Sequence, residues 1–432
     1  MVAEGHRVLS QDPLNAEPAP QLLASSFVTA NEHVYHRNHG EFVQLDTSTY
    51  KLIVASEVDE FRPTKSAFTL EEIKERFPKQ DLVTVLSCAG NRRTEMDHEK
   101  EVEGLKWGVS AIANCHFAGA LLSGLLRASG LDVDKLRTME QLHIHFETEQ
   151  NCQDDSFYAA SLPLAMALDP ERPTLLAYEM NRGTLELAHG FPLRLVVPGV
   201  IGARSVKWLE RIIIRDHESQ NFYQTSDYKV LPPQAGKENK AEFMKKTPAL
   251  MEFPLNSVIC SPAEDEQVPL RVDSDAKVDV KGYAIGPHGI RIDSVHVVAI
   301  PLPVPTSTPT DPSLLPEITS SAPYKIRAHA STLPASAWTR ATLDEGTAMP
   351  GALTAHDKHW GWTLFSAQVP LSDEIRHLAQ RIVEGGAEFG LVAFATDVDG
   401  HRQELQTQWN VRGVAEASWS VVQCRLVPQL SS

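Results

Sequence analysis

The chain has 432 residues, and its 40 Lys and Arg against 56 Asp and Glu give a formal net charge of −16. Such an acidic balance argues against nucleic acid as a partner. No stretch approaches the roughly 20 apolar residues that span a bilayer, so we do not expect a membrane protein. The five cysteines are odd in number and widely spaced, which favours free thiols in a reducing compartment over a disulfide framework.

The two ends of the sequence bear on its location. The N-terminal residues MVAEGHRVLS lack the apolar run of a secretory signal, and no twin-arginine pair precedes such a run. The C-terminal residues PQLSS do not form a strong peroxisomal signal. We therefore predict a cytoplasmic location, while a peroxisomal or mitochondrial one stays open.

The first half of the chain mixes strand and helix patterns after an irregular, polar start over residues 1–50. KLIVASEV (51–58) and DLVTVLSC (81–88) predict strands, the second one buried and ending at Cys88. FTLEEIKERF (68–77) predicts a helix with Thr69 as N-cap and Glu72 completing a capping box. HFAGALLSGLLRASG (116–130) has helical apolar spacing and a terminal glycine. Further strands are predicted at 142–148, 175–180, 191–199 and 206–214, and a short helix near 162–168. The mixture predicts an α+β domain over residues 1–245.

Beyond a polar, charged linker at 237–247 the pattern changes. Helix signals become scarce except around 372–383, and turn signals separate strand-like runs at 275–285, 292–300, 359–371 and 390–397. This pattern predicts a β-sandwich of immunoglobulin-like type over residues 246–432. The Pro/Ser/Thr-rich segment 301–323 predicts an exposed insertion between strands.

Cys88 is a candidate for chemistry because it ends a predicted strand and is followed by AGNRR. The thiol would there leave the core for a loop, beside Arg92 and Arg93, which favour its thiolate form. A thiolate is the form that a soft or high-valent metal binds. A buried structural cysteine is the commoner arrangement, and from spacing alone it is the preferred interpretation.

Several polar clusters are ambiguous when each is taken singly. The loop Tyr35-His36-Arg37-Asn38-His39 offers donors for an anion or a cofactor, and it fits a solvated surface loop equally well. His189 and Arg194 flank the start of an apolar strand and could bind a phosphate or simply mark a strand edge.

The remaining candidates have plain structural alternatives. In GARSVKWLERI, Arg204, Ser205 and Lys207 could hold phosphate, although a basic solvent-facing surface is the preferred interpretation. Trp107 and Tyr228 would more often be packing residues, and Arg412 a surface arginine.

Taken together, these signals match one family. SCAGNRRTEM, VEGLKWGVSAI, LLAYEMN, HGFPLRLVVPGVIGARSVKWL and SDYKVLPP resemble the sulfite oxidase family. The resemblance runs from NAEPAP near the N-terminus to WNVRGVAEASW near the C-terminus, and so covers almost the whole chain. It implies a molybdopterin-binding α+β domain followed by an immunoglobulin-like dimerisation domain, and hence a homodimer.

The resemblance also implies a site. Cys88 would be the protein's thiolate ligand to molybdenum, with the dithiolene sulfurs of the pterin supplying others. The pterin and its phosphate would be held by Tyr35, His36, Arg37, Asn38, His39, Cys88, Gln150, His189, Arg194, Ser205, Val206 and Lys207. Sulfite would bind in a pocket made by Arg37, Cys88, Arg93, Trp107, Tyr228 and Arg412. Guanidinium groups bind oxyanions through charge-assisted hydrogen bonds, so three arginines would focus positive potential in an otherwise acidic chain.

Gln150 departs from the family's pattern. The family usually has an Asp that contacts the cofactor in the segment that here is HFETEQNCQDD. An amide can accept and donate hydrogen bonds but carries no charge, which leaves the effect of this contact open.

The function implied by the resemblance is the oxidation of sulfite to sulfate by oxygen-atom transfer at a molybdenum–oxo centre. The close alternative is a nitrate reductase molybdenum domain, but such domains typically carry Asn in place of Tyr228 and Met in place of Arg412. A non-catalytic dimer that keeps the fold is a hypothesis of another class, and intact Cys88, Tyr228 and pocket arginines argue against it.

The electron acceptor follows from what the chain resembles. Nothing in it resembles the haem-binding cytochrome b5 domain or the flavin module that accompany some relatives, so we expect neither haem nor flavin. The architecture resembles the plant-type, haem-free enzyme, which implies molecular oxygen as acceptor. A separate cytochrome stays open.

Overall fold

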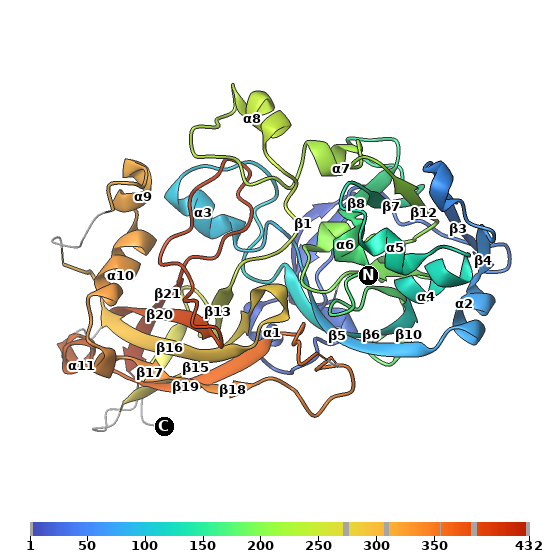
Figure 1. The fold of residues 1–432 in the computed structure, drawn as a ribbon. Coiled ribbons are helices and arrows are strands. Elements are labelled where there is room, and N and C mark those ends of the chain that lie inside the picture. The colour runs from blue at the N-terminus through green and yellow to red at the C-terminus, as the bar shows by residue number, and fades with distance from the viewer. Residues whose placement is uncertain (1–2, 271–275, 306–310, 355, 382–386, 429–432) are drawn as a thin grey trace.

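The computed structural model describes residues 3–270, 276–305, 311–354, 356–381 and 387–428. The N-terminal sheets lie on one side of the molecule and the C-terminal sheets on the other (Figure 1). Within the described ranges we find no helix with the length and apolar character needed to cross a membrane.

Two five-stranded sheets build the N-terminal part. One has the order β10 (Gly183–Thr184), β9 (Leu175–Met180), β6 (Ile112–Leu121) and β5 (Lys79–Ser87), with β11 (Arg194–Val196) paired to β9. The other has the order β4 (Ala67–Thr69), β3 (Lys51–Ser56), β12 (Arg211–Arg215), β7 (His143–Thr148) and β8 (Tyr158–Pro163). A ribbon of β1 (Arg7–Gln11) and β2 (Leu14–Glu17) precedes them.

Short helices connect these strands. The N-terminal part contains α1 (Pro20–Leu23), α2 (Leu70–Arg76), α3 (Arg93–Glu99), α4 (Leu122–Ala128), α5 (Val133–Arg137), α6 (Leu164–Ala167), α7 (Phe222–Thr225) and α8 (Lys240–Lys246). The predicted capping box is confirmed, since the Thr69 hydroxyl accepts from Glu72 N and the Glu72 carboxylate accepts from Thr69 N, both over 3.1 Å. Helix α6 lies at the predicted short helix.

The helix predicted over 116–130 is wrong in its first part, because strand β6 continues to Leu121 and α4 begins only at Leu122. Strand β6 pairs with β5 on one side and β9 on the other, and nearly all of its residues are buried. A strand buried on both faces loses the alternation of apolar and polar residues by which strands are recognised. The apolar run therefore resembled a helix.

The predicted strands at 191–199 and 206–214 are present but shorter or shifted. Only Arg194–Val196 and Arg211–Arg215 are extended. The residues between them form turns that carry side chains of the cavity described below, which is why the strand pattern there is incomplete.

Two sheets packed face to face form the C-terminal part, as predicted. One contains β13 (Asn256–Ser261), β15 (Lys277–Ile285), β19 (Thr363–Pro370) and β18 (Thr342–Asp344). The other contains β14 (Gln267–Leu270), β21 (Ser420–Pro428), β20 (Ala387–Asp397), β16 (Ile292–Pro301) and β17 (Thr339–Arg340). Val280 and Phe365 of the first sheet pack with Val297 and Leu391 of the second in one apolar core, the arrangement of a β-sandwich. Helix α11 (Asp373–Arg381) lies at the predicted position, and residues 382–383 fall outside the described ranges.

Two segments predicted as linker or exposed insertion contain helices. Within 237–247, α8 buries Met244. Within and after 301–323, of which 306–310 lie outside the described residues, α9 (Pro316–Ser320) buries Ile318 and α10 (Ala322–Ser331) buries Tyr324. Proline stands in the first turn of both later helices, where its missing N–H has no helical partner to lose. Two of the prolines in this segment, Pro316 and Pro323, therefore mark helix starts.

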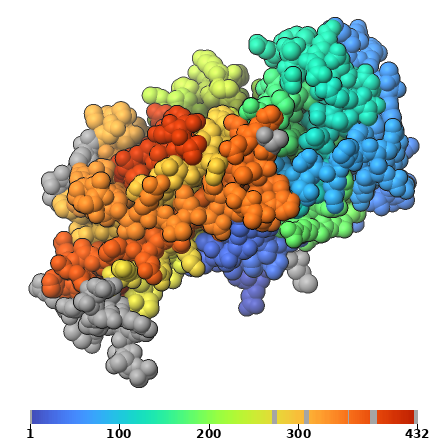
Figure 2. Space-filling model, turned by 60° about the horizontal axis from the view of Figure 1, so that its bottom comes forward, coloured from blue at the N-terminus to red at the C-terminus, as the bar shows by residue number. Residues whose placement is uncertain are grey.

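The N-terminal segment lies at the junction of the two parts, as the space-filling view shows in dark blue (Figure 2). Leu23 of α1 packs with Val85 and Ile112 of the N-terminal sheet and with Val258 and Trp362 of the sandwich. This shared apolar cluster fixes one part against the other, and the sandwich can therefore supply residues to a site in the N-terminal part.

Candidate active site

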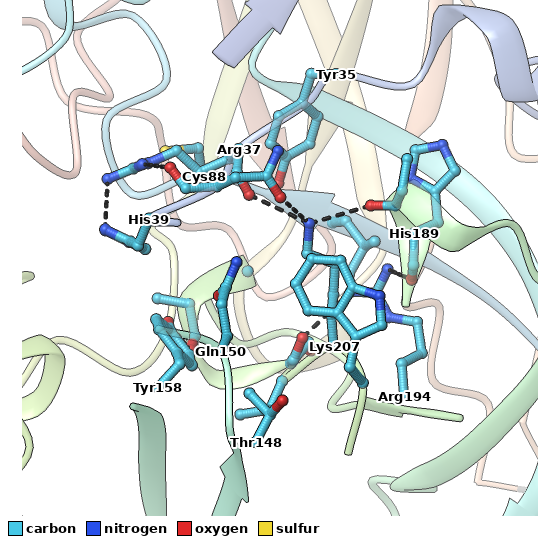
Figure 3. Close-up of a pocket in the computed structure, with 18 of the residues that line it drawn as sticks. Tyr35, Arg37, His39, Cys88, Thr148, Gln150, Tyr158, His189, Arg194 and Lys207 are labelled. Carbon is cyan, nitrogen blue, oxygen red and sulfur yellow. Dashed lines mark hydrogen bonds between the residues drawn. The ribbon is translucent and has the colours of Figure 1, made fainter. Parts of the chain in front are cut away.

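A cavity of about 760 Å³, counting its opening to solvent, lies in the N-terminal part (Figure 3). Its walls come from segments far apart in the chain: the loop 34–39, the end of β5, the residues after β7, the turn at 188–194, the segment 202–208, and Tyr228. The fold thus gathers most of the sequence-predicted residues around one space.

Cys88 lies one residue beyond β5 on the wall of this cavity. Its N–H donates to Ala111 O over 2.9 Å, and its carbonyl accepts from Asn91 N over 3.0 Å. Asn91 is held in turn by the Tyr283 hydroxyl of β15, which accepts from Nδ2 over 2.9 Å. The thiol therefore stands on a turn fixed by both parts of the molecule.

The two arginines after Cys88 point in different directions. Arg92 has a left-handed backbone (φ 67°) and donates to both carboxylate oxygens of Glu95, over 2.8 and 2.7 Å, and to Asn256 of the sandwich. The expectation that Arg92 flanks the thiol is therefore wrong. Arg93 packs against the turn, because a Cβ added at Gly90 would lie 2.4 Å from its Nη2 atom.

Arg37 and His39 meet at the phenol of Tyr228. The Nε2 atom of His39 lies 2.6 Å from Tyr228 Oη, and Arg37 Nη2 lies 3.2 Å from His39 Nδ1 and 3.4 Å from Tyr228 Oη. Burial, with Arg37 nearby, holds the pKa of His39 well below its usual value, so the imidazole is neutral. Since Arg37 can only donate, Nδ1 accepts and Nε2 donates to Tyr228, which leaves the phenolic hydrogen free to donate elsewhere.

Arg412, from the C-terminal part, meets Asp227, the residue directly before Tyr228. It forms an ion pair with Asp227 and a second with Glu103, the latter over 3.3 Å. Burial alone would raise the pKa of Asp227, but Arg412 and Arg37 lower it below its usual value, so the group is a carboxylate. Arg93 joins the two segments by donating from Nε to the Arg412 and Gly413 carbonyls over 3.1 and 3.0 Å.

These contacts define an arginine cup, made of Arg37, Arg93 and Arg412 around Tyr228 and Asp227. Trp107 lies behind it, fully buried, and packs edge-on against Tyr35 with ring centroids 6.4 Å apart. Tyr228 itself has a left-handed backbone (φ 49°), a strained conformation of the kind that recurs at functional sites.

The cavity wall carries a second set of cations, Lys207 and Arg194, which we call the cation end. Lys207 Nζ donates to Asn38 Oδ1 and, over 3.1 Å, to Ala188 O. Arg194 donates to His189 O over 2.9 Å and Ser205 O over 3.2 Å. In the part of the chain that the structure describes, neither cation pairs with a carboxylate.

The pKa values at the cation end are lowered, in keeping with the lack of a carboxylate partner among the described residues. Burial, with Arg194 and Arg37 nearby, holds the pKa of Lys207 well below its usual value. Burial lowers the pKa of Arg194 to about 10, and burial with Lys207 nearby lowers the pKa of His36 to about 4. A bound polyanion would reverse each of these effects.

The donor sets at the two ends fit a molybdenum–pterin cofactor. Among the described residues no group of three or more His, Cys, Asp and Glu could hold a metal by itself, so the single thiol of Cys88 suits a metal whose other ligands come with the cofactor. The buried Nε1 of Trp107 and Nδ1 of His36 have no partner among the described residues, and Lys207 and Arg194 supply the donors that a phosphate takes.

The structure brings together most of the predicted residues and adds others. All line the cavity except His36, Arg93, Trp107 and Arg412; His36 stacks on His189 with centroids 5.6 Å apart. Arg204 points away and donates to Tyr223 O over 3.0 Å. Sequence reasoning missed Thr148, Tyr158 and Asp227, although Asp227 directly precedes Tyr228 in SDYKVLPP.

Comparisons with known proteins match the chain along nearly its full length. The oxidoreductase molybdopterin binding domain matches residues 39–223, and the Mo-co oxidoreductase dimerisation domain matches 247–299. The sulfite oxidase of Arabidopsis thaliana is 34% identical over 428 residues, covering 97% of this chain and 94% of the plant protein.

Longer relatives match as well. The mitochondrial sulfite oxidase of Macaca fascicularis is 33% identical over 98% of this chain, which spans 66% of that protein's length. The inducible nitrate reductase (NADH) 2 of Glycine max is 30% identical over 96% of this chain, which spans 41% of its length. Among solved structures, the sulfane dehydrogenase SoxCD of Paracoccus pantotrophus has a TM-score of 0.64 at 21% identity, with 96% of this chain and 84% of that one covered. This last likeness concerns the fold alone.

Proposed function

The chain belongs to the sulfite oxidase family of molybdopterin oxidoreductases, and from this membership we propose that it oxidises sulfite to sulfate. One observation carries the proposal: the Cys88 thiol lies on the wall of a cavity that Arg37 and Tyr228 of the arginine cup and Lys207 and Arg194 of the cation end also line. The overall change is sulfite and water going to sulfate, two protons and two electrons. The bound cofactor supplies oxygen-atom transfer and takes up the two electrons.

The cup would bind and orient the sulfite oxyanion. Arg37, Arg93 and Arg412 carry three positive charges against the two negative charges of Asp227 and Glu103, a sum of +1. A small net positive charge favours binding of an oxyanion but does not hold it as tightly as an unpaired set of cations would. This balance suits an enzyme that must release sulfate in each cycle.

Tyr228 would assist at the reacting oxygen. Its phenol accepts from His39 and Arg37, so its own hydrogen can donate into the cavity. Burial raises the pKa of Tyr228 well above its usual value, against the effect of Arg37, and the phenol therefore stays protonated. Trp107 would close the cup on the side of Tyr35 and limit the entry of water.

Nitrate reduction is the second candidate, supported by the soybean relative. Tyr228 and Arg412 favour sulfite, because nitrate reductase domains typically carry Asn and Met at these positions. Both side chains take part in the cup, one accepting from Arg37 and the other paired with Asp227.

The acceptor and the assembly are further parts of the proposal. Molecular oxygen would take the two electrons and two protons to give hydrogen peroxide. The likeness to the plant-type enzyme supports this acceptor, since the match covers 94% of the Arabidopsis sulfite oxidase. A separate cytochrome is the alternative acceptor. The matched dimerisation domain supports a homodimer. All five cysteines are free thiols, which supports a cytoplasmic location.

The decisive experiment is a steady-state assay of molybdenum-loaded protein with sulfite and with nitrate, under oxygen and with cytochrome c. We expect sulfite-dependent oxygen consumption without cytochrome. Replacing Cys88 by serine should lower turnover at least 100-fold, about 2.7 kcal/mol of barrier, while circular dichroism stays unchanged. Unchanged sulfite oxidation by the Cys88→Ser protein would refute the ligand assignment, and protein without molybdenum would support a non-catalytic dimer.

A further inference from the structure

Gln150 directs its amide nitrogen toward the protein backbone. The residue follows β7, is buried, and lines the cavity (Figure 3). Its Nε2 atom donates to Gly40 O over 3.1 Å and to Glu41 O over 2.8 Å. Both N–H bonds of the amide are therefore used to hold one loop.

That loop is joined to the Gln150 segment at several points. Gly40 and Cys152 form a strand-like bridge, and Gln153 N donates to His39 O over 3.0 Å. The approach is so close that a Cβ at Gly40 would lie 1.9 Å from Asn151 O. Gln150 adds the side-chain contacts of this junction, next to the backbone of His39.

The loop in turn sets the geometry of the arginine cup. His39 lies 2.6 Å from the Tyr228 phenol and 3.2 Å from Arg37. A shift of the Gly40–Glu41 backbone would move His39 and thereby release the phenol that it holds.

The chemistry of position 150 decides which side chains can do this. Two carbonyl oxygens face the Nε2 atom, so the group there must donate. A carboxylate has no hydrogen to donate and would repel both carbonyls.

We propose that Gln150 is a positioning residue, which through its two N–H donors fixes the Gly40–Glu41 backbone and so holds His39 against Tyr228. Its effect on sulfite binding rests on the proposed function, whereas its effect on the loop does not.

The test compares Gln150→Glu and Gln150→Met with Gln153→Glu as a matched control. Gln153 is exposed on the same segment, and its side chain makes no hydrogen bond that the described residues show. The first readout is amide hydrogen exchange over residues 38–44 in cofactor-free protein, corrected for the intrinsic effect of pH. We expect exchange about tenfold faster in both Gln150 variants at pH 8 and unchanged exchange in the control.

Acidification separates a donor role from simple packing. At pH 5 the carboxyl introduced by Gln150→Glu, once protonated, can donate one hydrogen bond and should regain part of the protection, whereas Gln150→Met should not. Burial raises the pKa of the neighbouring Cys152 thiol to about 12, so that thiol does not titrate in this range. The second readout is the KM for sulfite, expected to rise about tenfold in Gln150→Glu at pH 8 and to fall toward the wild-type value at pH 5.

Several outcomes would overturn the inference. One is wild-type protection of the amides of residues 38–44 in both Gln150 variants. Another is an equal loss of that protection in the Gln153→Glu control. The third is wild-type protection in Gln150→Glu at pH 8. Failure of the wild-type protein to oxidise sulfite would instead overturn the proposed function, and the exchange result would stand by itself.

Discussion

The arginine cup and the cation end share one cavity, which Arg37, Lys207 and Arg194 line, yet their charges are arranged differently. In the cup, Arg412 pairs with two carboxylates, Asp227 and Glu103. At the cation end, Lys207 and Arg194 donate only to carbonyl and amide oxygens, and the described residues give them no carboxylate partner. One end is nearly balanced and the other is strongly positive.

This difference in charge balance fits the residence time that each site needs for its ligand. A buried charge without a counter-ion costs several kcal/mol, so the cation end becomes favourable once an anion neutralises it. A cofactor phosphate bound there would be held throughout many turnovers. The cup is already paired, so an anion gains less by entering it and leaves more easily.

The largest expected effect is on the cation end. Replacing Lys207 by methionine removes the charge and three donors but keeps most of the volume, and we expect molybdenum content per chain to fall at least tenfold. Metal analysis of purified protein measures it. In cofactor-free protein, the loss of the Lys207 hydrogen bonds destabilises the fold, whereas the removal of a buried charge stabilises it. Because these two effects oppose each other, Tm should change by no more than about 3 °C.

Lys79→Met is the control, since Lys79 is an exposed lysine paired with Glu179 far from the cavity. Normal molybdenum content in Lys207→Met would show that the cation end is not what retains the cofactor.

A third buried cluster shows the opposite imbalance. Arg92 and Arg327 carry two positive charges, whereas Glu95, Glu99 and Glu416 can carry three negative ones. Glu99 accepts from Arg327 over 2.6 Å, and one carboxylate oxygen of Glu416 is buried without a partner among the described residues. Burial, with Glu416 nearby and against the effect of Arg327, raises the pKa of Glu99 to about 7.

This raised pKa predicts a pH-dependent stability. Between the ordinary value of 4.5 and about 7 the folded protein binds one more proton than the unfolded chain, so the free energy of unfolding falls as pH rises through that window and is level above it. The loss between pH 5 and pH 7.5 should be roughly 2–3 kcal/mol. Urea unfolding of cofactor-free protein at pH 5 and pH 7.5 should show this difference, and Glu99→Gln should remove it.

The control is Glu101→Gln, which changes an exposed carboxylate on the same segment. If Glu99→Gln keeps the full difference between the two pH values, the cluster is not the group that titrates.

The fold could be predicted where side-chain burial follows a simple period. Strand β3 alternates exposed and buried residues, and the capping box before α2 is a local pattern. Strand β6 and helix α10 escaped prediction for opposite reasons. The first is buried on both faces, and the second begins in a proline-rich stretch and owes its burial to contacts with distant strands.

The site could be predicted only through long motifs. Cys88 and Arg37 lie on different elements, and nothing in their spacing indicates that they share a cavity. Arg92 and Arg93 are neighbours in sequence but contact different parts of the molecule, because Arg92 has a left-handed backbone (φ 67°) before α3 and Arg93 is the first residue of that helix. Asp227 escaped because a carboxylate is not expected in an anion pocket, although it is what makes the cup nearly neutral.

The smallest expected effect tests this balance in the cup. Asp227→Asn keeps the shape but raises the summed charge of the cup from +1 to +2, and we expect the inhibition constant for sulfate to fall about five- to tenfold. Glu103→Gln removes the same formal charge, but Glu103 is more exposed and is shared with Lys240, so water and that lysine should limit its effect to about twofold. Product-inhibition assays at fixed ionic strength measure both. Equal effects, or weaker sulfate binding in Asp227→Asn, would mean that Asp227 does not moderate anion binding but only holds Arg412 in place.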